Sequence, residues 1–171
     1  MRPLRFCQAC GSKVETPDKE GGARCGACGR TWYQNMAPTV GAAIIRDGKA
    51  LATIRAFDPM KGKHDVPGGF LKPHEEPLEG LRREVMEELS IEVTSSMEQV
   101  LQMVPHPYGE DGQWVLSIGF KATWVSGEPQ PADDVAAIEW VGIEDLDRLD
   151  FAWEHDRTLL RRALEDDQEP D

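Results

Sequence analysis

Short apolar runs bounded by turn residues recur along the chain after residue 39 and predict β-strands. Two of these runs, 40–45 and 50–54, flank the polar residues 46–49, which predict a hairpin turn. Later segments of similar composition predict further strands over 93–105, 113–124 and 135–141. Residues 109–112 are expected to form a turn between the first two of these.

A helical period replaces the strand pattern between residues 77 and 91. Apolar side chains recur there every three or four positions and form a stripe at Leu78, Leu81, Val85 and Leu89. Pro77 is tolerated in the first turn of a helix, so the helix is expected to begin near it. Residues 146–165 contain the pattern of a second amphipathic helix, with predicted core contacts at Leu159, Leu160 and Ala163.

The polar side of the first helix carries a dense group of acids. At about 100° per residue, Glu84, Glu87 and Glu88 share one stripe, and Arg83 flanks Glu87. Like charges at this spacing repel one another, and a divalent cation would remove the repulsion. Carboxylate oxygens suit Mg²⁺ or Mn²⁺ better than zinc. The alternative interpretation is an ordinary solvated helix face.

All four cysteines lie in the first 28 residues, in two C-x-x-C-G repeats formed by Cys7, Cys10, Cys25 and Cys28. Each repeat brings two thiolates toward one tetrahedral ion, and the glycine that follows tolerates a turn with positive φ. We therefore predict a structural Zn²⁺ in a small ribbon, a closed site with no open position for water. Two disulfides are the competing interpretation, but they need an oxidising compartment that no other feature supports.

Composition limits the kinds of partner. The 171 residues include 19 Lys and Arg against 31 Asp and Glu, so the formal net charge is −12. This balance argues against binding to nucleic acid or to an anionic membrane. The N-terminus has no apolar targeting segment, and no stretch is long enough to cross a membrane, so we expect a cytoplasmic protein.

The segment from Gly69 to Ile91 resembles the signature of the Nudix hydrolases. Gly69, five residues, Glu75, seven residues and then Arg83-Glu84-Val85-Met86-Glu87-Glu88 match G-x5-E-x7-R-E-U-x-E-E-x-G-U, in which U is aliphatic. Ser90 departs from the pattern, because the family has glycine there. A serine in the left-handed turn that ends such a helix is expected to cost about 1 kcal/mol or more.

This resemblance implies an α/β/α sandwich with a mixed central sheet, here preceded by the small zinc ribbon. We divide the chain into a zinc ribbon (1–35), a Nudix domain (36–165) and an acidic tail (166–171). The order of ribbon and Nudix domain resembles the NADH pyrophosphatase and FAD/ADP-ribose diphosphatase branches. Ribbon-bearing relatives are commonly dimers, so the resemblance implies a homodimer.

The resemblance also implies the roles of individual residues. Glu84, Glu87 and Glu88 would be metal ligands together with the backbone carbonyl of Gly68, and Arg83 would orient a glutamate. Glu75 fits a supporting or loop-closing role. An additional acid from outside the signature is expected at Asp134 or its neighbour Asp133, and Glu110 and Asp111 are weaker candidates at a hairpin tip.

The implied reaction is hydrolysis of a nucleoside diphosphate linked to another moiety. ADP-ribose, FAD or a related dinucleotide is favoured over NADH, because residues 102–108 keep only the prolines and an aromatic of the element typical of NADH pyrophosphatases. Candidate substrate contacts are Arg55, Phe70, Tyr108 and Trp114, with His106 as a further phosphate contact. The alternatives are an NADH, NAD-cap or (d)NTP pyrophosphatase and, in another class, a ligand sensor with an inactive Nudix domain and a ribbon that binds DNA or docks. Sensors of that kind usually lose these carboxylates, which favours the enzyme.

Overall fold

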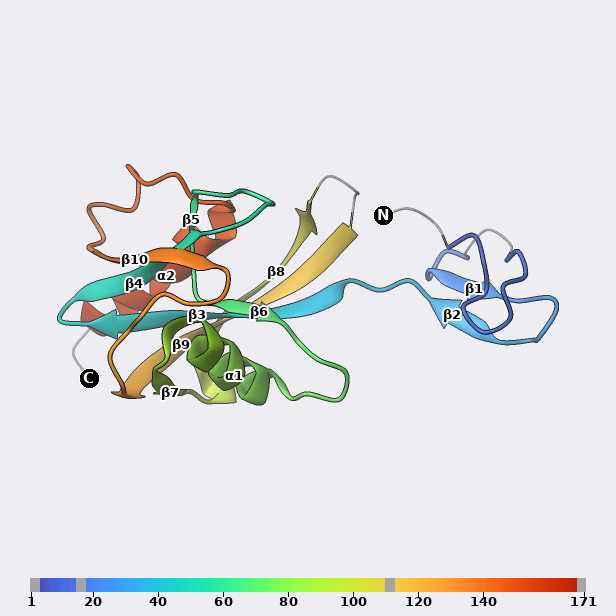
Figure 1. Cartoon of the computed structure of the whole chain (residues 1–171), viewed down its shortest axis with the longest axis horizontal. Coiled ribbons are helices and arrows are strands. Elements are labelled where there is room, and N and C mark those ends of the chain that lie inside the picture. The colour runs from blue at the N-terminus through green and yellow to red at the C-terminus, as the bar shows by residue number, and fades with distance from the viewer. Residues whose placement is uncertain (1–3, 15–17, 110–112, 169–171) are drawn as a thin grey trace.

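The computed structural model describes residues 4–14, 18–109 and 113–168, and it has two parts (Figure 1). A small N-terminal unit contains a two-stranded antiparallel sheet formed by β1 (Gly22–Arg24) and β2 (Thr31–Tyr33). An extended segment leads from it into a larger α/β unit, from which the small unit stands apart (Figure 1). The candidate acids Glu110 and Asp111 lie outside the described residues.

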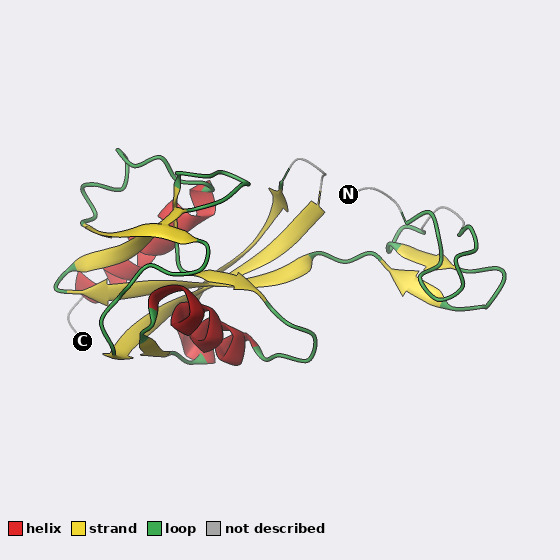
Figure 2. Ribbon diagram, in the orientation of Figure 1, coloured by secondary structure: helices red, strands yellow, loops and turns green. Residues whose placement is uncertain are grey.

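A mixed sheet forms the centre of the larger unit (Figure 2). Its path runs β10-β4-β3-β9-β7, while β5 pairs with β4, β6 with β3 and β8 with β9. The pairing of β3 with β9 is parallel, and the other pairings are antiparallel. The strands are β3 (Ala37–Arg46), β4 (Lys49–Arg55), β5 (His64–Asp65), β6 (Gly68–Phe70), β7 (Glu92–Thr94), β8 (Val100–Tyr108), β9 (Gln113–Ser126) and β10 (Val135–Val141).

Two helices, α1 (Pro77–Leu89) and α2 (Glu154–Gln168), build a separate core on each face of the sheet. Side chains alternate along β3, so that Val40 and Ala42 join the core under α1 while Ala43 joins the core under α2. The expected contacts of Leu159, Leu160 and Ala163 are confirmed, since all three are buried in the second core. The expected α/β sandwich with a mixed sheet is therefore confirmed.

One predicted strand is wrong in its extent. The segment 93–105 is not continuous, because a 3₁₀ turn, η1 (Met97–Gln99), separates β7 from β8. Ser96 caps this turn: its backbone N–H donates a hydrogen bond to Gln99 Oε1 over 3.0 Å. Such a local cap competes with strand hydrogen bonds, which explains the break.

The segment expected to form an acidic tail from residue 166 begins inside helix α2. Helix α2 continues through Gln168, and Lys121 Nζ lies 2.6 Å from Asp166 Oδ2 and 3.6 Å from Asp167 Oδ1. These contacts hold the end of the helix against β9. Residues 169–171 lie outside the part of the chain that the structure describes.

Candidate active site

Two glycines bring β6 against the acidic side of α1. A Cβ atom on Gly68, whose φ is +152°, would lie 2.0 Å from the carbonyl oxygen of Val40, so only glycine fits there. A Cβ on Gly69 would lie 2.7 Å from the carboxyl carbon of Glu84. The Gly68 N–H donates a hydrogen bond to Glu88 Oε2 over 2.9 Å. Gly69, the signature glycine, therefore allows β6 to approach the carboxylates of α1.

Arg83 connects the loop before α1 to the acids on the helix. Its Nε and Nη2 donate to the two carboxylate oxygens of Glu75 over 2.6 and 2.8 Å, and its Nη1 donates to Glu84 over 2.6 Å and to Glu87 over 3.0 Å. The Lys72 N–H also donates to Glu75, which closes the loop. Hydrogen bonds from Arg83 lower the pKa of Glu75 to about 2. Only 18% of the Arg83 side chain is exposed, so its ion pairs with the glutamates differ from ordinary surface ion pairs.

Glu88 is the most buried of the three helix acids, with 4% of its surface exposed. Burial, followed by the negative charge of Asp134, raises its pKa well above the ordinary value. Asp134 also lies within hydrogen-bonding reach of Glu88. The expected extra acid is therefore beside the signature helix, while its neighbour Asp133 adopts a left-handed turn conformation with φ of 51°.

The backbone places Asp134 there. The N–H groups of Gln130 and Ala132 donate to the carbonyls of Leu89 and Glu88 at the end of α1. The N–H of Ala56 then donates to the carbonyl of Asp134 over 2.7 Å. These bonds tie residues 127–134 to both the helix and β4, so the carboxylate is positioned by main-chain contacts.

This donor set fits a hard divalent cation. Glu88 is buried and Asp134 beside it is half-buried, and two acids this close are unfavourable unless a proton or cation compensates the charge. Carboxylate and carbonyl oxygens are the ligands that Mg²⁺ prefers. The ligand atoms of Glu84, Glu87 and Glu88 do not all converge in this structure, because Arg83 engages the first two while the third faces Gly68.

A cavity of about 100 Å³ adjoins the acids. Of the expected substrate contacts, Arg55, Phe70 and Tyr108 line it, and Trp114 does not. His106 also lines it. Sequence reasoning missed the other titratable and aromatic lining residues, namely Asp65, Trp153, His155 and Asp156. Trp153 directly precedes α2, within the range 146–165 in which the sequence predicted a helix, and no local pattern marked it as a cavity residue.

The cavity has an aromatic wall. Tyr108 stacks on Trp153 with ring centroids 5.4 Å apart, and Phe70 meets Tyr108 edge-on at 5.3 Å. The rings of His106 and His155 lie 4.1 Å apart. Burial lowers the pKa of both histidines, and burial together with the charge of His106 lowers that of His155 to about 4. The histidines are therefore neutral at pH 7, and the wall suits a planar, uncharged ring.

Arg55 lies between the aromatic cavity and the acids. It lines this cavity and also a smaller polar cavity, which Glu88 and Asp134 line as well. Its Nη1 donates to Asp65 Oδ2 over 2.6 Å and its Nε to the carbonyl of Pro59 over 2.7 Å. The guanidinium carbon is 5.1 Å from the centre of the Trp153 ring. This cation stands where a phosphate between the two cavities would need one.

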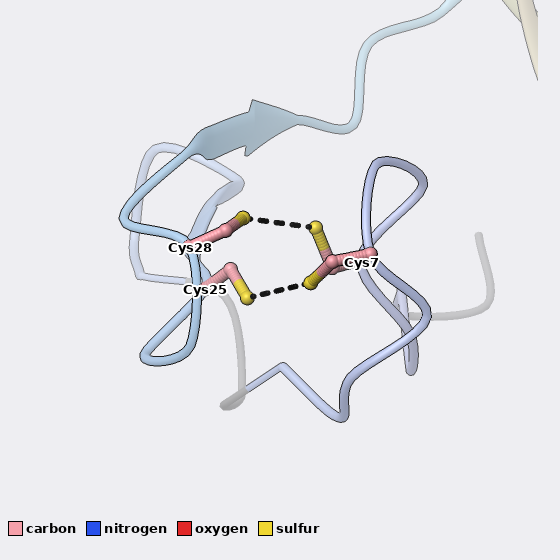
Figure 3. A group of neighbouring side chains, drawn as sticks. Cys7, Cys25 and Cys28 are labelled. Carbon is pink, nitrogen blue, oxygen red and sulfur yellow. Dashed lines mark hydrogen bonds between the residues drawn. The ribbon is translucent and has the colours of Figure 1, made fainter.

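The four cysteines form a second cluster in the small unit, where all four ligand atoms lie within 4.8 Å of one another. The Sγ atoms of Cys7 and Cys28 are 3.6 Å apart, as are those of Cys10 and Cys25 (Figure 3). These distances exceed a disulfide bond of about 2.05 Å. They are close to the roughly 3.8 Å between ligands of tetrahedral zinc with Zn–S bonds of about 2.3 Å. The geometry suits zinc and the cysteines are free thiols.

Each cysteine pair sits on the same kind of turn. The N–H of Gly11 donates to the carbonyl of Cys7, and the N–H of Gly29 donates to that of Cys25, both over 2.9 Å. Both glycines have positive φ, 71° and 73°, as the sequence predicted. Trp32 Nε1 also donates to Cys7 Sγ over 3.3 Å. Burial opposes ionisation of Cys7, but this bond and backbone N–H groups prevail and lower its pKa to about 6.

An α/β sandwich with a signature helix of acids beside a cavity with an aromatic wall defines a hydrolase of the Nudix class. Residues 36–163 match the model of the NUDIX domain, and the chain belongs to the NUDIX family. In the part of the chain that the structure describes, no helix is long and apolar enough to cross a membrane.

Relatives of known activity include the NAD-capped RNA hydrolases NudC. The chain is 31% identical to the protein of Pseudomonas aeruginosa over 150 residues, covering 86% of this chain and 51% of that protein. It is 25% identical to that of Chromobacterium violaceum over 162 residues, covering 94% and 58%. The chain thus spans about half the length of these relatives.

Solved structures share the fold. A NUDIX hydrolase from Nitrosomonas europaea superimposes with a TM-score of 0.74 at 23% identity, covering 98% of this chain and 95% of that one. A MutT NUDIX hydrolase from Burkholderia pseudomallei superimposes with a TM-score of 0.66 at 28% identity, covering 74% of this chain and 97% of that one.

Proposed function

We propose that the chain is a Mg²⁺- or Mn²⁺-dependent pyrophosphohydrolase that cleaves the diphosphate of a nucleoside diphosphate linked to another moiety. The observation that carries this proposal is the pairing of buried Glu88 with half-buried Asp134 beside a cavity with an aromatic wall. Intact acids at Glu84, Glu87 and Glu88 argue against an inactive sensor.

Each residue of the site has a distinct role in this reaction. Glu84, Glu87, Glu88 and the Gly68 carbonyl would hold the divalent ions, which would lower the pKa of water and screen phosphate charge. Arg83 keeps Glu84 and Glu87 oriented. Asp134 accepts a proton from the attacking water or adds a ligand. Breaking the bridging P–O bond leaves two phosphate monoesters.

Substrate binding combines the cation and the aromatic wall. Arg55 contacts a phosphate by charge-assisted hydrogen bonds, and Phe70, Tyr108 and Trp153 contact the base. Trp114, outside the cavity, has no place in this scheme. The relatives named for NAD-capped RNA favour an NAD-type dinucleotide. ADP-ribose and FAD are the second candidates, because residues 102–108 depart from the NADH-type element.

In the small unit, Cys7, Cys10, Cys25 and Cys28 hold a structural Zn²⁺. We retain the division into a ribbon of residues 1–35 and a catalytic domain from residue 36, and the expectation of a homodimer. The net charge of −12 favours a small nucleotide substrate over a long RNA.

Hydrolysis with Mg²⁺ across a panel of NADH, NAD⁺, ADP-ribose, FAD, dinucleoside polyphosphates and dNTPs tests this function. We expect a dinucleotide to have the highest kcat/KM. Glu87→Gln and Glu88→Gln should each lower turnover by about a hundredfold or more, while Glu165→Gln, an exposed acid on α2, should not. Near-wild-type turnover in both signature variants would show that the metal site is assigned wrongly.

A further inference from the structure

Two aspartates with no role in the proposed reaction meet in the wall of the cavity that Tyr108 and Trp153 line. Asp65 ends β5, and Asp156 lies in the first turn of α2. Asp156 is 3% exposed and the side chain of Asp65 is 13% exposed. The two carboxyl groups are within hydrogen-bonding reach of each other. A buried contact between two acids requires a physical explanation, because two carboxylates cannot hydrogen bond to each other.

Donors reach the two acids unequally. Asp65 accepts from Arg55 Nη1 over 2.6 Å and from the N–H of Val66 over 2.8 Å, as an ionised carboxylate would. Asp156 Oδ1 lies 3.3 Å from Nε2 of His155. Asp156 Oδ2 is buried and has no hydrogen-bond partner among the described residues. Leaving such an oxygen charged and unpaired is costly, and a proton on Asp156 makes it a donor to Asp65.

The surrounding charges favour the same protonation state. The titratable or charged groups that face the acid pair from the packed elements are Arg55 on β4, His106 and Tyr108 on β8, Asp134 before β10 and His155 on α2. Arg55 is the one cation among these groups, so a second ionised carboxylate beside Asp65 would add negative charge next to the phosphate position. Burial, then the charge of Asp65, raises the pKa of Asp156 well above its usual value.

We propose that Asp65 and Asp156 share one proton and that this pair is the positioning device for Arg55. The neutral Asp156 carboxyl donates to Asp65, and Asp65 in turn fixes the guanidinium of Arg55 between the two cavities. Loss of the proton would place a second negative charge behind Arg55 and weaken its attraction for phosphate. The positioning role rests on the proposed function, whereas the shared proton does not.

The shared proton is tested by ¹³C NMR of protein labelled at aspartate carboxyl carbons and titrated with pH. We expect one carboxyl of the pair to remain protonated at pH 7, and its signal to disappear in Asp156→Asn. Asp147→Asn, which changes an exposed acid in an ion pair with Arg161, is the matched control. Two ionised carboxyls at pH 7 would overturn the proposal whatever the enzyme hydrolyses.

The positioning of Arg55 is tested by the KM and kcat for NADH and by the Kd for NADH without divalent metal, between pH 6 and 9. In the wild type we expect KM and Kd to rise once Asp156 ionises, by up to about tenfold per pH unit. Asp156→Asn, which keeps a neutral donor, should bind at pH 7 as the wild type does and lose this rise. Asp65→Asn should raise KM with little change in kcat.

Two results would overturn the positioning role. One is a rise of KM and Kd at alkaline pH that persists in Asp156→Asn. The other is an unchanged KM and Kd in Asp65→Asn. A thermal melt of each variant separates loss of fold from loss of binding. If the wild type hydrolyses no nucleotide of the panel, the proposed function fails, while the NMR titration and the Kd still decide this inference.

Discussion

At the scale of single residues, Ser90 illustrates how a departure from a family pattern is accommodated. It ends α1 in the left-handed conformation, with φ of 57° and ψ of 30°, and its N–H donates to the carbonyl of Met86 over 3.0 Å. The turn that glycine normally makes is therefore present, and the serine bears its conformational cost.

We expect Ser90→Gly to raise the free energy of unfolding by about 0.5–1 kcal/mol, because glycine adopts this conformation without strain. Chemical denaturation and a thermal melt measure it. Ser90→Ala keeps the strain and serves as the control. Lower stability in the glycine variant would contradict the prediction.

His155 provides a prediction on pH. Its pKa falls from 6.5 to about 4 on folding, chiefly because of burial. Between these values the unfolded chain binds more protons than the folded one, so the stability present above pH 6.5 is lost as the pH falls toward 4. Allowing for partial exposure, the loss is about 1–2 kcal/mol.

The free energy of unfolding, measured by denaturation at a series of pH values between 4 and 7, should therefore depend less on pH in His155→Gln than in the wild type. His74→Asn is the matched control, because His74 is an exposed loop histidine with φ of 69°, a conformation that asparagine tolerates. If the free energy of unfolding changes equally with pH in all three proteins, the assignment to His155 is refuted.

Residue types with a strong chemical signal were predictable, and others were not. The spacing of Glu84, Glu87 and Glu88 follows from helical geometry alone. Trp114 and Tyr108 look alike in the sequence, yet only Tyr108 lines the cavity. Which of them does so depends on packing against Trp153, a long-range contact that no local pattern encodes.

At the scale of elements, Arg83 fixes the loop before α1 to the helix by hydrogen bonds to three glutamates and to the carbonyl of Phe70. Lysine carries the same charge but lacks the planar fork that makes these bonds. We expect Arg83→Lys to lower stability by about 1–3 kcal/mol and to reduce kcat.

Arg82→Lys is the control, because Arg82 is the adjacent, exposed residue of the same helix. Thermal melts and steady-state kinetics of the two variants make the comparison. If Arg83→Lys changes stability and kcat no more than Arg82→Lys does, the hydrogen bonds of Arg83 have no structural role.

Element boundaries were predictable where local chemistry marks them. Pro77 marks the first turn of α1, and the hairpin between β3 and β4 turns at Asp47 and Gly48, both with positive φ. The break between β7 and β8 was missed, because apolar residues continue on both sides and the cap at Ser96 was not recognised. The residues expected to form the acidic tail begin within α2, where Lys121 on β9 contacts Asp166 and Asp167.

At the scale of the whole molecule, the ribbon and the sandwich are stabilised separately. Of the described residues, those that make up the two cores of the sandwich all lie between positions 40 and 164. The ribbon has little apolar material of its own, so we expect its fold to depend on a bound metal.

We expect one zinc ion per chain by elemental analysis, and less in Cys28→Ser. A chelator should unfold the ribbon and expose residues 34–36 to proteolysis while leaving the melting temperature of the sandwich unchanged. A fall in that melting temperature after chelation would contradict separate stabilisation. Lys13→Gln, an exposed ribbon residue, should retain zinc.

The main-chain anchoring of residues 127–134 has a consequence for engineering. The bonds that hold Asp134 beside α1 come from amides and carbonyls, so they do not depend on which side chains the loop carries. Glu128 and Gln130 are exposed on this loop. Either position therefore offers a place for a fluorescent or spin label a few residues from the reacting groups, where a reporter can follow substrate arrival without altering the chemistry.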